Sequence, residues 1–253
     1  DPCIGDALME LGRRMTREPV RCNDSPGFLV NQVGRGYNIE AAHIHSEQVA
    51  DIPDLDLILS EGAGFRMGPF TLLDLTGLDV THPATELIYR QFYEEPRYRP
   101  NVMMRARMEA GMLGRKTKRG FYDYSSGKQN FPEEAPYPEY DGRPVWISRE
   151  NADGHAVLTE IVSKIGGNLE TGDSPGNNAL ILVTPIGDDV TTTAVAQGLD
   201  PARTLGVDTL VGLASRRTIM TNPATEPAYR DAAHGLLTGD GVKATVIRDC
   251  PGF

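Results

Sequence analysis

Few side chains in this 253-residue chain have the type and spacing that chemistry on a substrate or a metal requires. His43 and His45 lie two residues apart, so they point to different faces of a helix and predict no metal site. Only Glu40 and Glu47 lie near enough at helical spacing to orient either imidazole. A basic turn could meet phosphate groups, although a solvated surface turn is the stronger interpretation. Its members are Arg115, Lys116, Lys118 and Arg119.

The glycines do not form a dinucleotide-binding fingerprint. That fingerprint places three glycines between a strand and a helix, where the backbone approaches a pyrophosphate. The turn from Ser148 to Gly154 has one glycine, and Glu150 and Asp153 place negative charge where the pyrophosphate would lie. Glycine-rich patches at 166–167 and 172–176 do not connect a strand to a helix and predict loops. We therefore expect no NAD site in the second half of the chain.

Charge and composition narrow the classes of partner. Residues 1–128 carry 16 basic and 18 acidic side chains, whereas residues 129–253 carry 9 and 17, so most of the net charge of −10 lies in the second half. An acidic second half argues against nucleic acid and anionic membranes as partners, and the longest apolar run, 179–183, is too short to span a bilayer. Cys3, Cys22 and Cys250 show neither pairing nor metal-ligand spacing, which favours reduced thiols in a cytoplasmic protein.

A near-repeat marks two places where a helix is expected to begin. Asp24-Ser-Pro-Gly-Phe-Leu-Val-Asn31 follows a predicted strand at 18–22, and Asp249-Cys-Pro-Gly-Phe253 follows one at 243–247. Asp24 and Ser25 can cap a helix, and Pro26 suits its first turn. Apolar residues at helical spacing then predict a long helix over about 27–49.

The remaining pattern predicts two kinds of architecture. Helices are expected at 6–15, 52–59, 69–77, 84–93 and 102–110, followed by a linker or draped segment at 125–144. Strand and helix candidates then alternate at 145–148, 152–165, 179–184, 191–198, 209–213, 218–220, 227–237 and 244–247. Such alternation is typical of a doubly wound α/β structure.

Residues 20–124 resemble the C-terminal helical domain of 3-hydroxyacyl-CoA dehydrogenases, a family that includes the 3-hydroxybutyryl-CoA and 3-hydroxyadipyl-CoA enzymes. Three blocks carry the resemblance in order: the motif from Asp24 to Gln32, the stretch from Gly62 to Asp79, and Gly114-Arg-Lys-Thr-Lys-Arg-Gly-Phe-Tyr-Asp-Tyr124. The resemblance implies a multidomain fold, with an all-α domain like the C-terminal domain of 6-phosphogluconate dehydrogenase and an α/β reduced Rossmann-like domain. In the latter, Met220-Thr-Asn-Pro-Ala224 resembles a family segment but lacks its catalytic histidine, so this copy is expected to be inactive.

The resemblance also implies domain boundaries. Residues 1–128 correspond to the helical domain, with 1–19 as the end of a preceding NAD domain. A linker at 129–143 leads to the reduced Rossmann-like domain at 144–249, and 250–253 correspond to the start of a second, truncated helical domain. We therefore expect the chain to be a fragment.

The function that the resemblance implies is oxidation of an L-3-hydroxyacyl-CoA to the 3-ketoacyl-CoA, within fatty acid β-oxidation, by an NAD-dependent oxidoreductase. The catalytic His–Glu pair and the NAD site belong to a domain absent from this chain, so the fragment is expected to be inactive alone. Asn31 is the catalytic residue that carries over, as an amide donor to a substrate oxygen. Residues 67–69 could wall the acyl pocket, or simply pack. The expected partners are an acyl-CoA substrate and a second copy, through a homodimer contact of the helical domain. A non-catalytic binding or scaffold module is the alternative.

Overall fold

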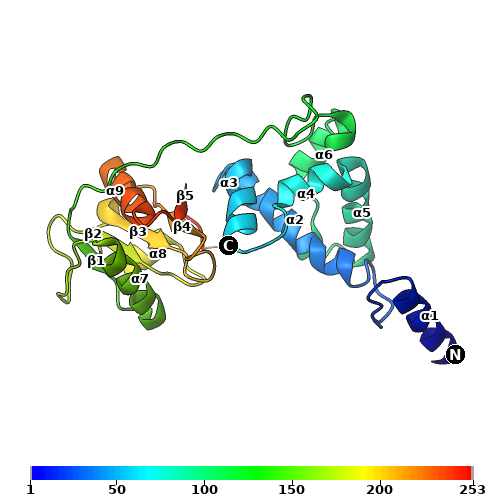
Figure 1. Ribbon diagram of the computed structural model, residues 1–253, viewed down its shortest axis with the longest axis horizontal. Coiled ribbons are helices and arrows are strands. Elements are labelled where there is room, and N and C mark those ends of the chain that lie inside the picture. The colour runs from blue at the N-terminus through cyan, green and yellow to red at the C-terminus, as the bar shows by residue number, and fades with distance from the viewer. Residues whose placement is uncertain (1, 252–253) are drawn as a thin grey trace.

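The structure is a computed structural model that describes residues 2–251, with helices in its first part and a mixed sheet in its second (Figure 1). Glycines and prolines separate the helices, as Pro69 and Gly77 do at the two ends of α4. The helical elements are α1 (Pro2–Arg14), α2 (Val30–Ser46), α3 (Ile52–Leu57), the π-helical turn η1 (Ile58–Gly62), α4 (Pro69–Thr76), α5 (Leu78–Gln91), η2 (Pro96–Tyr98), α6 (Val102–Glu109) and η3 (Arg115–Thr117).

The second part of the described chain alternates strands and helices, as its sequence pattern predicts. Its elements are β1 (Val145–Ile147), α7 (Ala152–Ile165), β2 (Leu180–Val183), α8 (Val190–Ala196), η4 (Pro201–Arg203), β3 (Thr204–Val207), β4 (Arg216–Met220), α9 (Pro227–Thr238) and β5 (Lys243–Ile247). The strands follow one another in the order β1-β2-β3-β4-β5. All neighbouring pairs are parallel except β3 and β4, which are antiparallel, so the sheet is mixed.

The two faces of the sheet are covered by different parts of the chain. On one face α7 and α9 pack on apolar side chains of the strands, among them Leu182, Val207 and Ile219. On the other face α8 packs on β2 and β3, and Val183, Met220 and Ile247 share one apolar cluster with Phe70 and other residues of the helical part. Residues far apart in the sequence thus form a common core between the helical part and the sheet.

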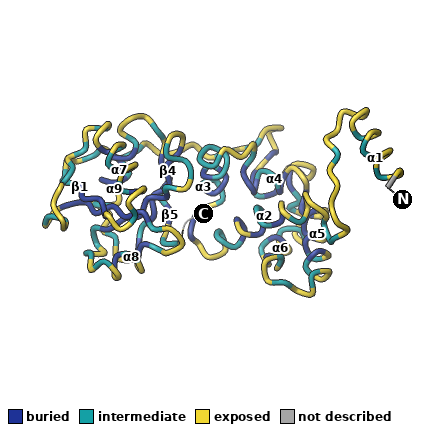
Figure 2. The backbone as a smooth tube through the Cα atoms, turned by 90° about the horizontal axis from the view of Figure 1, so that it is seen from below, coloured by how far each residue is buried: buried dark blue, intermediate teal, exposed yellow. Residues whose placement is uncertain are grey.

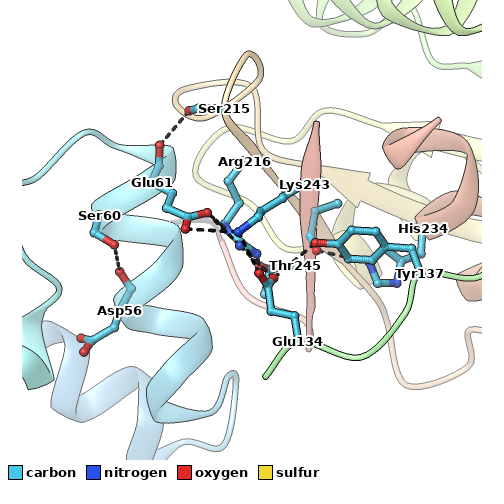
Figure 3. Close-up of polar contacts among 11 residues, drawn as sticks. Asp56, Ser60, Glu61, Glu134, Tyr137, Ser215, Arg216, His234, Lys243 and Thr245 are labelled. Atoms are coloured by element: carbon cyan, nitrogen blue, oxygen red, sulfur yellow. Dashed lines mark hydrogen bonds and ion pairs between the residues drawn. The ribbon is translucent and has the colours of Figure 1, made fainter. Parts of the chain in front are cut away.

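A buried charge joins the same two parts (Figure 3). Arg216 on β4 is only 1% exposed, and its guanidinium lies 2.8 Å from both Glu61 of η1 and Glu134 of the segment before β1. Lys243 on β5 reaches the same two carboxylates at 3.4 and 3.0 Å. Thr245 accepts a further hydrogen bond from Arg216 at 2.8 Å. We call these five residues the charged junction.

The segment between η3 and β1 runs from the helical part to the sheet and contacts both (Figure 1). Gln129 donates to Thr71 Oγ1 at 2.8 Å, and Phe131 stacks on Tyr122. Further along, a Cβ at Gly235 of α9 would lie 2.6 Å from the carbonyl oxygen of Pro138. The glycine therefore lets the segment lie directly on α9.

Helix α1 projects from the rest of the molecule and is largely exposed (Figure 2). Its apolar side chains Ile4, Leu8 and Leu11 each expose more than half of their surface. No helix among the described residues is long and apolar enough to cross a bilayer.

Some expected elements are wrong. Residues 17–23 form no strand, because no other strand of the described chain pairs with them. Residues 209–213 form a loop, and the neighbouring strand is β3 instead. Helix α5 begins at Leu78 rather than at 84, with Pro83 inside it. In the second near-repeat, Asp249 accepts from Val190 N at 2.7 Å at the start of α8, while Gly252 and Phe253 lie outside the described residues.

Candidate functional site

The turn before α2 decides where Asn31 lies. Gly27 has φ +76° and Phe28 has φ +49°, both in the left-handed region, so a right-handed helix cannot include them. Helix α2 therefore begins at Val30, three residues later than predicted, and its start has no side-chain cap. The predicted capping by Asp24 and Ser25 is wrong for the same reason.

Asn31 is the second residue of α2, and its side chain is exposed. Its amide oxygen accepts a hydrogen bond from the guanidinium of Arg35 at 3.0 Å, and its carbonyl oxygen accepts from Arg35 Nε at 3.3 Å. Arg35 also donates to Thr81 O at 3.2 Å and to Thr85 Oγ1 at 3.0 Å, both on α5. The exposed amide is thus fixed to a guanidinium that lies between two helices.

The surface beside Asn31 is apolar. Phe28, Leu29, Val30 and Val33 expose 48 to 79% of their surface at the start of α2. Exposed apolar side chains that lie together indicate a contact surface rather than an ordinary solvent face. The amide therefore lies beside a surface that another molecule or domain can cover.

Two buried carboxylates connect the second and third sequence blocks through hydrogen bonds. Asp56 of α3 accepts from Phe70 N at 2.8 Å, from Thr71 N at 2.9 Å and from the Tyr122 hydroxyl at 2.9 Å. Asp74 of α4 accepts from the backbone N–H groups of Phe121 and Tyr122, each at 2.9 Å. Burial raises the pKa of both carboxyls. These two aspartates were not predicted, because a charged residue is by default assigned to the surface.

The weaker candidates have structural partners. His43 Nδ1 lies 3.5 Å from Asn101 Nδ2, and His45 Nδ1 lies 3.2 Å from Ala50 O. In the 67–69 stretch, the Met67 carbonyl accepts from the Tyr37 hydroxyl at 2.7 Å.

The basic turn has one ion pair, between Lys116 and Asp79 at 2.7 Å. Arg115 lies over the ring of Tyr124. All four basic side chains of this turn are exposed.

The segment from Met220 to Ala224 offers no acid–base group. Met220 is fully buried in the core, and Thr221 donates to the Ile247 carbonyl at 3.0 Å. Asn222 donates to the carbonyls of Pro201 and Thr204 and accepts from Ala224 N. These residues therefore connect the loop to the sheet.

A hollow of about 990 Å³ lies at the carboxyl ends of β1 and β2, the place where doubly wound folds bind ligands. Asn151 at its base accepts from Gly154 N at 3.1 Å and donates to Thr184 O at 3.0 Å, so α7 is capped by the chain itself. A Cβ at Gly154 would lie 2.2 Å from Thr184 Oγ1, which assigns this glycine to helix–strand packing.

The charges around the hollow do not fit the pyrophosphate of NAD. Arg149 and Arg203 line it, but they form ion pairs with Asp173 at 2.8 Å and Asp200 at 2.9 Å. Glu150 and Asp188 also line it. Its acidic side chains outnumber its basic ones, so a dianionic group would be repelled. Within residues 2–251, no group of three or more potential ligands is arranged to hold a metal ion.

Comparison with known proteins shows what the helical part is similar to. Residues 27–124 match the family model described as 3-hydroxyacyl-CoA dehydrogenase, C-terminal domain. The 3-hydroxyadipyl-CoA dehydrogenase of Escherichia coli is 39% identical over 126 residues, which cover 50% of this chain and 26% of that protein. The mitochondrial hydroxyacyl-coenzyme A dehydrogenase of Mus musculus is 37% identical over 119 residues, which cover 47% of this chain and 38% of that protein.

Among solved structures, the crystal structure of 3-hydroxybutyryl-CoA dehydrogenase from Escherichia coli has a TM-score of 0.73 and 26% identity. The match covers 98% of this chain and 47% of the other, so it includes the helices and the sheet together. The chain spans less than half the length of each of these relatives. The resemblance predicted from the sequence blocks is confirmed, since residues 27–124 match the C-terminal-domain model of 3-hydroxyacyl-CoA dehydrogenases.

Proposed function

We propose that this chain is part of an NAD-dependent L-3-hydroxyacyl-CoA dehydrogenase, in which the exposed amide of Asn31 binds the reacting oxygen of the substrate. The observation that carries the proposal is the position of Asn31: it belongs to the matched family domain, it is exposed, and its orientation is fixed by Arg35. The apolar surface beside it supports a site completed by another domain. The names of the relatives support a 3-hydroxyacyl-CoA as substrate.

In this proposal Asn31 stabilises charge rather than moving a proton. When the hydroxyl group is oxidised, its proton leaves the oxygen and a hydride leaves the adjacent carbon, so negative charge develops on the oxygen before the carbonyl is complete. An amide N–H held in place before the reaction stabilises that charge without having to reorganise. Bound NAD would supply the hydride acceptor, and the acid–base residue would lie outside this chain. The chain alone would therefore bind acyl-CoA at most weakly and would not turn it over.

The test is formation of NADH from NAD and L-3-hydroxybutyryl-CoA. A complete protein that contains this chain and the proposed NAD-binding domain is expected to form NADH with the L substrate and not with the D substrate. The isolated 253-residue chain is expected to form none. Turnover by the isolated chain, or no turnover by the complete protein with any L-3-hydroxyacyl-CoA, would refute the proposal.

We further propose that the α/β part does not bind NAD, because its turn after β1 is capped, glycine-poor and acidic. Titrating the isolated chain with NADH while following the nucleotide fluorescence should give no saturable binding at micromolar concentration. Saturation in that range would show that the hollow accepts a dinucleotide despite its charge.

The proposal includes a homodimer and a cytoplasmic location. Exposed apolar side chains on α1 support a contact between copies. Light scattering of the complete protein should give twice the monomer mass, and a monomer mass would contradict the dimer. Fractionation of cells that express the complete protein should place it in the cytoplasm.

A further inference from the structure

Arg35 is a buried cation whose partners are all neutral. It is 9% exposed, and its hydrogen bonds go to two backbone carbonyls, one hydroxyl and one amide oxygen. Among the residues that the structure describes, no Asp or Glu forms an ion pair with it, and burial is the only influence on its pKa. Burial lowers the pKa of its guanidinium, but an arginine keeps its charge at neutral pH. An unpaired buried charge costs free energy, so we ask what this guanidinium does.

The guanidinium is held rigidly from the side of α5. Thr81 and Thr85 are buried, and Thr85 Oγ1 donates to Thr81 O at 2.8 Å, which leaves its lone pairs free to accept from Arg35. The bond from Arg35 Nε to Asn31 O fixes the guanidinium from the side of α2. With both helices holding it, the guanidinium cannot rotate to follow a change in the Asn31 side chain.

This rigid donor decides which way the Asn31 amide faces. A guanidinium has only donors, so the amide group opposite it must be the oxygen, and this conclusion follows from the chemistry of both groups. With Oδ1 bonded to Arg35 at 3.0 Å, the Nδ2 group is the other end of the planar amide and is the end left to donate to a substrate. An asparagine without this partner could turn either end toward a substrate.

We propose that Arg35 is the positioning residue that turns the donor end of Asn31 toward the substrate oxygen. The inference rests on the proposed function of Asn31. The charge of Arg35 acts in the same direction as the geometry, because a hydrogen bond to a cation polarises the amide and strengthens its N–H as a donor. Arg35 would touch neither substrate nor cofactor and would act only through Asn31.

The test in the complete enzyme is a double-mutant cycle of Arg35→Met and Asn31→Ala. Arg35→Met is expected to lower kcat about tenfold with little change in KM, because the amide is no longer held in its productive orientation. In the Asn31→Ala background the same change should lower kcat no further, since the residue acts only through the amide. Arg35→Lys should restore part of the loss, because an ammonium keeps the charge but cannot bridge both helices.

The control is Ile39→Val, a substitution in the core on the same helix. It tests whether a small loss of packing in α2 is enough to lower kcat, and it should leave kcat unchanged.

A second measurement in the isolated chain does not depend on activity. Asn31→Asp places a carboxylate against the unpaired guanidinium, so its Tm should equal or exceed that of the wild type, whereas Asn31→Ala should lower the Tm. The aspartate should nevertheless abolish activity in the complete enzyme, because it has no donor to offer. A lower Tm for Asn31→Asp, or equal kcat effects of Arg35→Met with and without Asn31, would overturn the inference. If the wild-type complete enzyme is inactive the proposed function fails, and the Tm comparison still tests the pairing.

Discussion

At the scale of single residues, the site depends on a backbone conformation that only certain residues adopt. Gly27 delays the start of α2, and a Cβ there would lie 3.0 Å from Gln32 N and from Ile88 Cδ1. The position of Asn31 on the first turn therefore depends on a residue without a side chain. Gly34, on the exposed face of the same helix, has no heavy atom within 4 Å of an added Cβ.

The two glycines predict mutational effects of opposite sign. Gly27→Ala should destabilise the chain by about 1–2 kcal/mol, because an L side chain disfavours the left-handed backbone. Gly34→Ala should stabilise it by about 0.5–1 kcal/mol, because alanine loses less entropy in a helix. Urea unfolding of both variants measures this. The account of the turn is contradicted if both substitutions change the free energy of unfolding in the same direction.

Single residues also differ in whether the sequence could predict them as part of the site. Asn31 was predicted from its motif, but the contacts of its partner Arg35 with Thr81 and Thr85 span 46 and 50 residues of sequence. No local sequence pattern predicts contacts between residues so far apart in the chain. The signal present was the four-residue spacing of Asn31 and Arg35, which places both side chains on one face of a helix.

At the scale of elements, buried carboxylates start and join helices. Asp56 binds the first backbone N–H groups of α4 and the Tyr122 hydroxyl, and the Phe70 and Tyr122 donors are buried. Asp56→Ala should therefore lower the free energy of unfolding by at least about 2 kcal/mol, because these buried donors lose their acceptor. Asp189→Ala, at the N-cap of α8, should cost about 1 kcal/mol. Thermal unfolding followed by circular dichroism compares them, and equal losses would contradict the special role of Asp56.

Elements also differ in how well their sequences predict them. The limits of α7 were predicted at Ala152 and Ile165, where the structure places them, because Asn151 caps one end and Gly166 closes the other. Strand β3 was missed, since it has four residues and includes Gly206. A Cβ at Gly206 would lie 2.6 Å from Val190 Cγ2, so the glycine is required by the packing of α8. That requirement comes from the tertiary structure, so local strand propensity does not predict it.

At the scale of the whole molecule, the charged junction holds the helices against the sheet. Burial acts to raise the pKa of Glu134, but Lys243 and Arg216 together hold it below its ordinary value. A carboxyl with a lowered pKa in the folded state stabilises the fold above its unfolded pKa, and this stabilisation is lost as the pH falls through the folded value. Neither Arg216 nor Glu134 was singled out in the sequence, because their pairing joins segments that are far apart in it.

The junction therefore predicts a pH-dependent mutational effect. Glu134→Gln should lower the free energy of unfolding at pH 7 by about 1–3 kcal/mol, the cost typical of losing hydrogen bonds to charged groups. The difference from the wild type should shrink as the pH is lowered below about 4, where the wild-type carboxyl is also neutral. Glu109→Gln, in the exposed pair with Arg105, should show no resolvable change at either pH. If the effect of Glu134→Gln does not depend on pH, the charge of Glu134 is not what stabilises the fold.

The central claim, that this chain supplies one amide donor to a 3-hydroxyacyl-CoA dehydrogenase, is tested most directly by steady-state kinetics of Asn31→Ala in the complete protein with NAD and L-3-hydroxybutyryl-CoA. The account predicts that kcat falls about tenfold or more while the protein remains folded, because one positioned donor to the developing charge is lost. A kcat equal to that of the wild type would contradict it.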